Sequence, residues 1–364
     1  MIWSINMRIV LSTIALAAAV VLGVVVVRAQ RPLEIYYIDV EGGGATLFVS
    51  PSGESLLVDA GNPGARDVQR ILDVLSDARI KQIDYFLATH YHSDHVGGVP
   101  ELAGRIPIRH FVDHGPENLD EGKFRGSDDL FNGYLAARAK GQPLQVKPGD
   151  KVPIAGLDVS IVSARGDRLT AALPGGGAAN PLCAGFVRQE EDKSENARSV
   201  GIVLRHDRFS TLALGDLTWN KEWELVCPNN LLGVVDVYLT THHGLDLSGP
   251  RALVHAIRPR VAIMNNGPRK GASSGAWTTV KSSPGLEDLW QLHYALQRPP
   301  NAMFNETRES GGPELNVPER FIANLAEEAA HTPTYYFRVT ARPDSSFTVF
   351  NSRTKDSKDY GPRR

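Results

Sequence analysis

The chain has 364 residues, with 39 Lys and Arg against 41 Asp and Glu and a formal net charge of −2. This balance excludes the broad basic surface that binds nucleic acid through net charge. Only two cysteines occur, Cys183 and Cys227, and neither falls in a zinc-like cluster or beside a histidine, which excludes a cysteine nucleophile.

The N-terminus has the pattern of an export signal. Met7-Arg8 precedes an apolar stretch, residues 9–27, and Val27 and Ala29 stand three and one residues before a cut ahead of Gln30. The apolar run also approaches the ~20 residues that span a bilayer, so an uncleaved anchor is the alternative. Residues 1–29 are therefore a signal peptide or an N-terminal membrane anchor. The rest is expected to be periplasmic or secreted, or anchored facing outside the cytoplasm.

Strand patterns open the remaining chain. Two apolar runs, 35–49 and 55–61, are joined through Pro51-Ser52-Gly53 and predict an antiparallel hairpin, with Asp59 at its end. Residues 65–78 then carry apolar side chains at helical spacing.

The next strand, 83–88, leads into the densest chemical pattern of the chain. Three of only 11 histidines and one aspartate fall within six residues: His90, His92, Asp94 and His95. Side chains i and i+2 of an extended chain share a face, so His90 and His92 can hold one ion together. Imidazole nitrogens and a carboxylate suit zinc, or manganese with more oxygen ligands, and two neighbouring ions could share one hydroxide.

Residues 106–115 predict the next parallel strand, whose end would bring Asp113 and His114 near the same edge. His114 is a candidate ligand, and an imidazole held in a turn explains it equally well. A helix over 128–140 carries Tyr134, a candidate substrate contact.

The Gly- and Ala-rich stretch 165–196 predicts a long loop over the cleft, free to act as a lid. Export would allow Cys183 and Cys227 to pair, while two buried thiols fit the sequence equally well.

Two later strands also end in ligand-type residues. Residues 209–216 form an apolar strand ending in Gly215-Asp216, and 234–244 form another ending in His242-His243-Gly244. A strand over 260–266, a helix over 286–296 and a hairpin of 335–340 with 346–350 follow, and residues 352–364 predict a flexible polar tail. A basic stripe could meet phosphate, although a solvated rim is the favoured explanation: Arg258, Arg260, Arg269, Lys270 and Lys281.

The spacing from His90 to His95 resembles the HxHxDH hallmark of the metallo-β-lactamase superfamily. A narrower likeness, to the ComEC-type metallo-hydrolase domain of competence proteins, rests on four stretches: 38–43, 146–150, 196–200 and 241–244.

This resemblance implies an α/β chain with the metallo-β-lactamase fold, a four-layer αββα sandwich, over residues 30–351. It implies two divalent metal ions, zinc first and manganese as the alternative. The implied ligands are His90, His92, Asp94, His95, Asp216 as the bridge, and His243. It also implies that Asp59 braces the histidine loop, that Asp94 orients the hydroxide, and that His242 is either a substitute ligand or a substrate contact.

The chain departs from that pattern in two places. Relatives usually read Val-Gly-Gln-Gly-Asp where this chain has Val40-Glu41-Gly42-Gly43-Gly44, so their aspartate is absent. Many superfamily enzymes also place a further histidine where this chain offers Asn196 and Ser199. An amide oxygen is a weaker zinc ligand than imidazole, so Asn196 and His114 are the candidates to complete the first metal.

The expected function is therefore an exported binuclear hydrolase that uses a metal-bridging hydroxide on a phosphoester or phosphodiester. A lactonase or β-lactamase-like carbonyl hydrolase is one alternative, and a non-catalytic, metal-containing envelope binding protein is another. The expected partner is a small-molecule or phosphodiester substrate. The sequence leaves nucleic acid and oligomeric state open, allows membrane contact only through the N-terminal anchor, and offers no other membrane helices for DNA uptake.

Overall fold

The computed structural model describes residues 31–115, 127–298, 310–327, 330 and 332–363. The chain divides into two compact units, Met1–Arg31 and Pro32–Arg364, and the second contains the strands and helices described below. The expected signal peptide or anchor lies outside the described residues. Among the described helices, none has both the length and the apolar character needed to cross a membrane.

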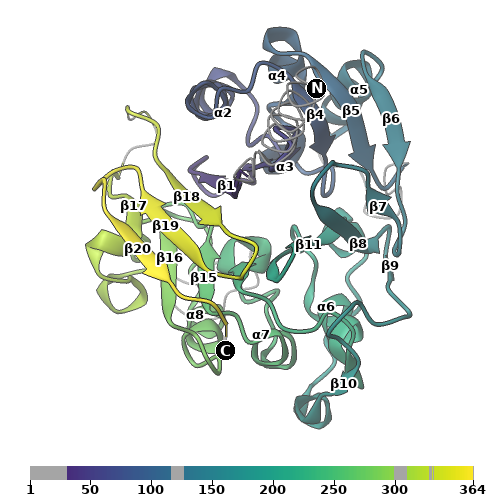
Figure 1. Ribbon diagram of the computed structural model, residues 1–364, viewed down its shortest axis with the longest axis vertical. Coiled ribbons are helices and arrows are strands. Elements are labelled where there is room, and N and C mark those ends of the chain that lie inside the picture. The colour runs from purple at the N-terminus through teal and green to yellow at the C-terminus, as the bar shows by residue number, and fades with distance from the viewer. Residues whose placement is uncertain (1–30, 116–126, 299–309, 328–329, 331, 364) are drawn as a thin grey trace, which may run out of the picture. The chain divides into compact units, whose positions relative to one another are not determined.

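Nine strands form the first sheet, in which strands far apart in the sequence lie side by side (Figure 1). In spatial order they are β20 (Ser357–Tyr360), β19 (Phe347–Asn351), β18 (Tyr336–Ala341), β1 (Leu33–Ile38), β2 (Thr46–Val49), β3 (Ser55–Val58), β4 (Ile83–Leu87), β5 (Ile108–Asp113) and β6 (Gln142–Gln145). The predicted hairpins, β2 with β3 and β18 with β19, are confirmed as antiparallel pairs.

The second sheet contains both parallel and antiparallel strand pairs. Its strands are β17 (Ile322–Asn324), β16 (Asp288–His293), β15 (Val261–Met264), β14 (Val237–Leu239), β12 (Phe209–Ala213), β11 (Gly201–His206), β8 (Asp158–Ala164) and β7 (Lys151–Val152), with β9 (Asp167–Arg168) beside β8. A separate two-stranded sheet pairs β10 (Ala178–Ala179) with β13 (Asn229–Asn230).

The helices pack on the outer faces of the two sheets. They are α2 (Ala65–Asp77), α3 (Ser93–Val96), α4 (Val99–Arg105), α5 (Ser127–Arg138), α6 (Trp219–Val226), α7 (Arg251–Ile257) and α8 (Ser274–Lys281). Short 3-10 helices are η2 (Pro181–Gly185), η3 (Glu195–Arg198), η4 (Thr241–Gly244), η6 (Pro313–Leu315) and η7 (Glu319–Phe321).

Alternation along β1 explains the layering. Ile35 and Tyr37 join the core that contains the second sheet and helices α6 to α8, whereas Tyr36 and Ile38 join the core under α2, α4 and α5. A strand sends successive side chains to opposite faces, so the apolar run from Ile35 to Ile38 is covered on both faces. The four-layer αββα sandwich predicted from the sequence is confirmed.

Parallel strands bring the motif residues to shared sheet edges. In the first sheet β3, β4, β5 and β6 are parallel, and in the second β12, β14, β15, β16 and β17 are parallel. Loops that follow the carboxyl ends of parallel strands emerge at one edge of the sheet. Asp59 follows β3, the histidine motif follows β4, Asp216 follows β12 and His243 follows β14.

The helix expected over 286–296 is wrong, because residues 288–293 form β16. Every position from Leu289 to His293 is buried, and a strand covered on both faces cannot be told from a buried helix by its periodicity. The helix of this region, α8, comes earlier in the chain, before β16.

The expected flexible tail is also ordered. Residues 357–360 form β20 on the edge of the first sheet, and the Tyr360 hydroxyl donates to Asp288 Oδ2 over 2.6 Å. Arg363 Nε donates to Asp236 Oδ1 over 3.1 Å. These partners are distant in sequence, which is why a polar composition alone gave the wrong expectation.

The stretch 165–196, expected to be a long loop over the cleft, is joined to other parts of the fold at two places. A disulfide joins Cys183 to Cys227, which resolves the open question of their pairing. The pairing of β10 with β13 holds the Gly-rich part of the same stretch.

Candidate metal centre

Asp59 supports the loop that carries the histidine motif. Its two carboxylate oxygens accept hydrogen bonds from the Thr89 backbone N–H (2.8 Å) and the Thr89 hydroxyl (2.9 Å). Oδ2 also lies 2.7 Å from His95 Nδ1. The predicted bracing contact is therefore present, and it directs His95 Nε2 away from Asp59.

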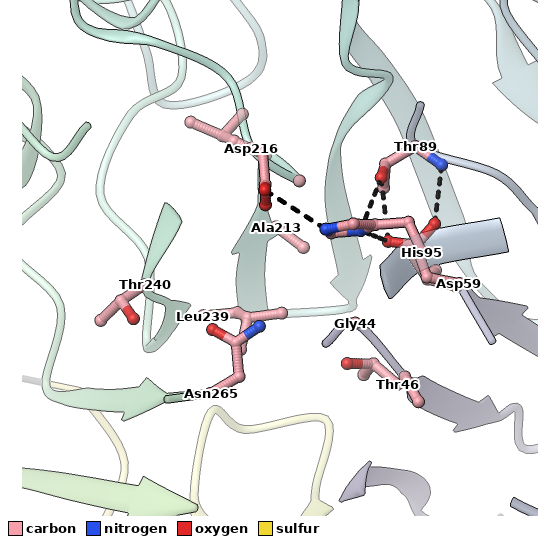
Figure 2. Close-up of a pocket in the computed structure, with 14 residues that line it drawn as sticks. Gly44, Thr46, Asp59, Thr89, His95, Ala213, Asp216, Leu239, Thr240 and Asn265 are labelled. Carbon is pink, nitrogen blue, oxygen red and sulfur yellow. Dashed lines mark hydrogen bonds and ion pairs between the residues drawn. The ribbon is translucent and has the colours of Figure 1, made fainter. Parts of the chain in front are cut away.

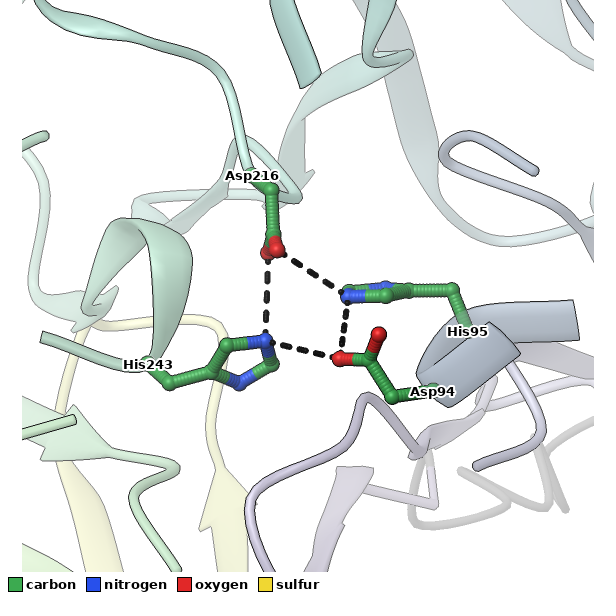
Figure 3. A group of neighbouring side chains, drawn as sticks. All are labelled: Asp94, His95, Asp216 and His243. Atoms are coloured by element: carbon green, nitrogen blue, oxygen red, sulfur yellow. Dashed lines mark ion pairs between the residues drawn. The ribbon is translucent and has the colours of Figure 1, made fainter. Parts of the chain in front are cut away.

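The His95 Nε2 atom faces two carboxylates. It lies 3.2 Å from Asp94 Oδ2 and 3.3 Å from Asp216 Oδ2 (Figure 3). His95 is buried, which opposes charge, but Asp216, Asp94 and Asp59 together raise its pKa well above the usual range. Its Nε2 makes no hydrogen bond of good geometry with any described residue, and a bound cation would take the place of the proton that the raised pKa keeps on this ring.

His90 and His92 converge as a second donor pair. His90 Nδ1 lies 3.0 Å from the Thr89 hydroxyl, and His90 Nε2 lies 3.1 Å from His92 Nδ1. Two nitrogens bound to one zinc at ~2.1 Å each lie about 3–3.5 Å apart. Burial, then the neighbouring His95 and His92, holds the pKa of His90 well below its usual range, so the imidazole is neutral and can coordinate a metal.

Asp216 stands between these groups. Its Oδ2 lies 3.3 Å from His95 Nε2, 3.4 Å from His242 Nε2 and 4.0 Å from His90 Nε2, and its Oδ1 lies 3.3 Å from His243 Nε2. Burial would raise its pKa, but His243, His95 and His242 hold that pKa well below the usual range. A carboxylate with donor nitrogens around both oxygens has the arrangement of a bridging ligand.

The turn η4 presents two consecutive histidines to the site. His242 and His243 both have positive φ, 55° and 57°, so the backbone reverses sharply there. His243 Nε2 also lies 3.3 Å from Asp94 Oδ2, and Asp94, His95, Asp216 and His243 offer ligand atoms all within 4.8 Å of one another. His242 is outside that group; its Nδ1 lies 3.2 Å from the Ser248 hydroxyl.

Asn265 supports His243 from behind. Its side-chain nitrogen is placed 3.0 Å from His243 Nδ1, while its Oδ1 is buried without a hydrogen-bond partner among the described residues. If the amide oxygen and nitrogen are exchanged, Oδ1 accepts from His243 Nδ1–H. That arrangement leaves His243 Nε2 with its lone pair facing Asp94 and Asp216.

The two candidates for completing the first metal have different surroundings. His114 Nε2 lies 3.0 Å from Glu195 Oε2, which also accepts the Tyr91 backbone N–H over 3.3 Å, so His114 supports the loop between His90 and His92 from behind. Asn196 follows Glu195, and its Oδ1 is buried without a hydrogen-bond partner among the described residues. Of the two, Asn196 has the oxygen that a cation would satisfy.

Tyr134, expected as a substrate contact, lies instead in the core. Its hydroxyl donates to Asp113 Oδ2 over 2.7 Å, and the same carboxylate pairs with Arg138. Tyr134 is fully buried, which leaves no path for a substrate to reach it.

Two of the five residues of the basic stripe, for which a solvated rim is the favoured explanation, pair with carboxylates in the structure. Arg260 pairs with Glu287 over 2.7 Å, whereas Lys270 Nζ donates to Asp94 Oδ2 over 2.5 Å. Lys270 is thus the member of the stripe that reaches the metal centre. Sequence reasoning missed this role, as it missed Glu195 and Asn265, since each lies on a loop remote from the histidine motif.

A small cavity lies beside the cluster, lined by residues of both sheets (Figure 2). Its volume of about 20 Å³ suits about one water molecule. Gly44 is part of its wall. A Cβ at Gly44 would come within 2.8 Å of Asp59 Oδ2 and 2.9 Å of His95 Nδ1, so any side chain at this position would displace the Asp59–His95 pair.

A second group with ligand-type side chains lies apart from this centre: Asp39, Glu41 and His293. Arg70 Nη1 already pairs with Glu41 Oε1 over 3.0 Å, and Asn324 donates to Asp39 Oδ2 over 2.7 Å. These contacts connect α2 and both sheets, so we assign this group a structural role.

Part of the chain matches the model of a known family. Residues 39–179 match the family model described as Metallo-beta-lactamase superfamily. No curated protein matches. The metallo-beta-lactamase fold protein YhfI from Bacillus subtilis is 11% identical with a TM-score of 0.44, covering 72% of this chain and 96% of that one.

Two further solved structures are similar at comparable distance. CmlA, a diiron beta-hydroxylase from Streptomyces venezuelae, is 16% identical with a TM-score of 0.38, covering 64% of this chain and 44% of that one. A metallo-beta-lactamase with a HARLDQ motif from Cronobacter sakazakii is 15% identical with a TM-score of 0.32, covering 52% and 65%.

Proposed function

We propose that this chain, which carries a metallo-β-lactamase superfamily domain with the fold of that name, is an exported binuclear metal-dependent hydrolase of a phosphoester or phosphodiester. The observation that supports it most directly is the position of Asp216. One oxygen of this carboxylate faces His243, and the other faces His90, His95 and His242. Two cations could therefore share Asp216.

The ligand sets divide on either side of that carboxylate. His90, His92 and Asp216 would hold the first ion, with Asn196 as the candidate to complete it. Asp94, His95, His243 and Asp216 would hold the second ion. The ligand atoms of these four residues lie close enough together to contact a single ion. Two divalent cations held there would lower the pKa of a shared water toward neutrality and polarise the bond under attack.

The side chains around the ligands divide the remaining work. Asp59 and Asn265 fix the ring orientations of His95 and His243 through their Nδ1 atoms. Burial lowers the pKa of His242 to about 4, so at neutral pH its imidazole is uncharged and can contact a substrate beside Asp216. An amide oxygen in the first set would favour zinc less than imidazole does, which keeps manganese as the alternative metal.

Export is part of the same proposal. It rests on the N-terminal pattern of residues 1–29 and is supported by the disulfide between Cys183 and Cys227, since disulfides persist in oxidising compartments. Cell fractionation tests it, together with N-terminal sequencing of the purified chain. Recovery in the cytoplasmic fraction would contradict it, and sequencing separates cleavage before Gln30 from an uncleaved anchor.

The activity test uses a chromogenic phosphodiester with zinc or manganese added to the purified chain. His92→Ala removes one donor of the first ion, and His110→Ala is the matched control, because His110 stacks on Tyr85 outside the centre. We expect turnover with wild type and the His110 variant, and loss of turnover in the His92 variant. If the chain binds metal and hydrolyses a lactone or β-lactam but not the phosphodiester, the substrate is a carbonyl compound and the phosphoester proposal is wrong. No turnover of any of them would support a binding protein.

A further inference from the structure

We propose that Lys270 forms an anion subsite beside the metal centre, and that its ammonium binds a phosphate oxygen of the substrate. This inference rests on the proposed function and deepens it. It assigns a substrate contact to a residue on the loop between β15 and α8, outside the motifs that mark the centre in the sequence.

The position of the ammonium is the first observation. Lys270 Nζ donates to Asp94 Oδ2 over 2.5 Å, and this same oxygen lies 3.2 Å from His95 Nε2 and 3.3 Å from His243 Nε2. The lysine therefore places its positive charge on the oxygen that faces both imidazoles of the second ligand set. A cation bound by those imidazoles and Asp94 would repel the ammonium from that oxygen.

The backbone keeps Lys270 next to the centre even when its ammonium moves. Gly267 N–H donates to Lys270 O over 2.9 Å, which closes a tight turn. The residues that follow are joined to the histidine turn, since Ala272 N–H donates to His243 O and Ser273 N–H to Gly244 O. A Cβ at Gly271 would come within 2.0 Å of His243 O, so the two loops are in close backbone contact.

The side chain has access to a ligand from solvent. Lys270 is 21% exposed and Asp94 is 19% exposed, whereas His95, His243 and Asp216 are almost fully buried. Lysine carries its charge on a flexible four-carbon stem, so the ammonium can leave Asp94 without any backbone change. It thus lies at the open side of an otherwise buried cluster.

The charge balance indicates an anionic partner. Two divalent cations bring more positive charge than Asp94 and Asp216 can cancel, and Lys270 adds to the excess. Asp59 is already paired with His95. A phosphoester carries negative oxygens beside the bond that is broken, and an ammonium binds such oxygens as a compact point charge.

The alternative explanation is that Lys270 is a structural ion pair joining loops that are 176 residues apart in the sequence. The two explanations differ in the metal-loaded chain. A structural pair would be needed for folding or metal retention, whereas an anion subsite would be needed only for binding the anion.

The test is calorimetric titration of inorganic phosphate into the zinc-loaded full chain, with bound zinc measured for each variant. Lys270→Met and Lys270→Gln remove the ammonium, and Lys270→Arg keeps a cation. Arg269→Met is the matched control, since it removes a positive charge from the exposed neighbouring position of the same turn. We expect Lys270→Met and Lys270→Gln to keep their zinc and bind phosphate about 10- to 100-fold more weakly, as expected for one charge-assisted hydrogen bond. Arg269→Met should match wild type, and Lys270→Arg should retain part of the affinity.

Several outcomes would overturn the proposal. They are unchanged phosphate affinity in Lys270→Met, loss of zinc or of folding in both neutral variants, or no phosphate binding by wild type. Acetate bound as tightly as phosphate, with the same dependence on Lys270, would reassign the subsite to a carboxylate. If phosphate binding depends on Lys270 but the chain does not hydrolyse the phosphodiester, the proposed hydrolase function is wrong and the anion subsite stands. If the chain hydrolyses the phosphodiester but phosphate binding does not depend on Lys270, only the anion subsite is wrong.

Discussion

Asp59 Oδ2 lies 2.7 Å from His95 Nδ1, and this contact fixes which nitrogen of His95 faces the metal centre. A carboxylate that accepts Nδ1–H holds the imidazole in the tautomer with a lone pair on Nε2. Because Asp59 also accepts two hydrogen bonds from Thr89, the position of the whole histidine loop depends on this one carboxylate.

Replacing Asp59 with Asn should weaken metal binding without removing a ligand. The amide supplies a poorer acceptor for His95 Nδ1, and losing such a partner typically costs 10–100-fold in metal affinity. Competition with a chromophoric chelator measures this. Asp73→Asn on the surface of α2, where Asp73 contacts Gln69, is the control. Equal zinc affinity in wild type and Asp59→Asn would show that the bracing contact has no effect on the metal.

The two histidines of η4 should differ when each is replaced by Ala. His243 belongs to the four-residue ligand group and His242 does not, so His243→Ala should lose one of two bound ions. His242→Ala should keep both ions and lose about tenfold or more in kcat through its substrate contact. Elemental analysis and kinetics of each purified variant separate the two roles. If His242→Ala loses an ion and His243→Ala keeps both, then His242 is the ligand and His243 is the substrate contact.

Buried Glu222 should make stability depend on pH. Burial raises the pKa of its carboxyl to about 8, against 4.5 as its ordinary value. Between these values the folded chain holds a proton that the unfolded chain has released. Stability therefore falls as pH rises from 4.5 to 8, by about 1.4 kcal/mol for each pH unit.

Glu222→Gln removes this dependence, because an amide has no proton to lose. In metal-free protein, the free energy of unfolding of the variant should increase relative to that of wild type as pH rises to 8. Above pH 8 this difference should stay constant. Chemical denaturation at several pH values measures it. Glu224→Gln, on the same helix but partly exposed and paired with Arg188, provides the comparison. Parallel pH profiles for wild type and Glu222→Gln would refute the raised pKa.

Removing the disulfide should destabilise the chain. Cys183 and Cys227 are 44 residues apart, and cross-links of this kind typically contribute about 2–4 kcal/mol to the free energy of unfolding. A double Cys→Ser variant should have its unfolding midpoint at a lower denaturant concentration than wild type. A reducing agent should lower the unfolding midpoint of wild type to the same concentration. Mass spectrometry that finds two free thiols in the untreated chain would show that the bond does not form.

The sequence predicted those parts of the molecule that local patterns encode. The strand before His90, the helix over 65–78 and the parallel strand before His114 follow from periodicity and were found as expected. The segment 286–296 was predicted wrongly because β16 is covered on both faces, and the tail was predicted wrongly because Tyr360 finds Asp288 far away in the sequence.

The same distinction applies to the site. His90, His92, Asp94 and His95 stand together in the sequence, and Asp216 and His243 end clear strands, so each could be proposed before the fold was known. Lys270 and Asn265 lie on a loop and Glu195 begins the short helix η3, and the positions of these segments depend on how the two sheets pack. No local pattern marks such residues, because their roles arise from contacts across the sandwich.

The most direct test of the binuclear centre is anomalous diffraction at the zinc edge from crystals of the zinc-loaded chain. We expect two peaks on either side of Asp216, about 3.5–4 Å apart. One would be in contact with His90 and His92, and the other with Asp94, His95 and His243. A single peak, or peaks at Asp39, Glu41 and His293 instead, would contradict it.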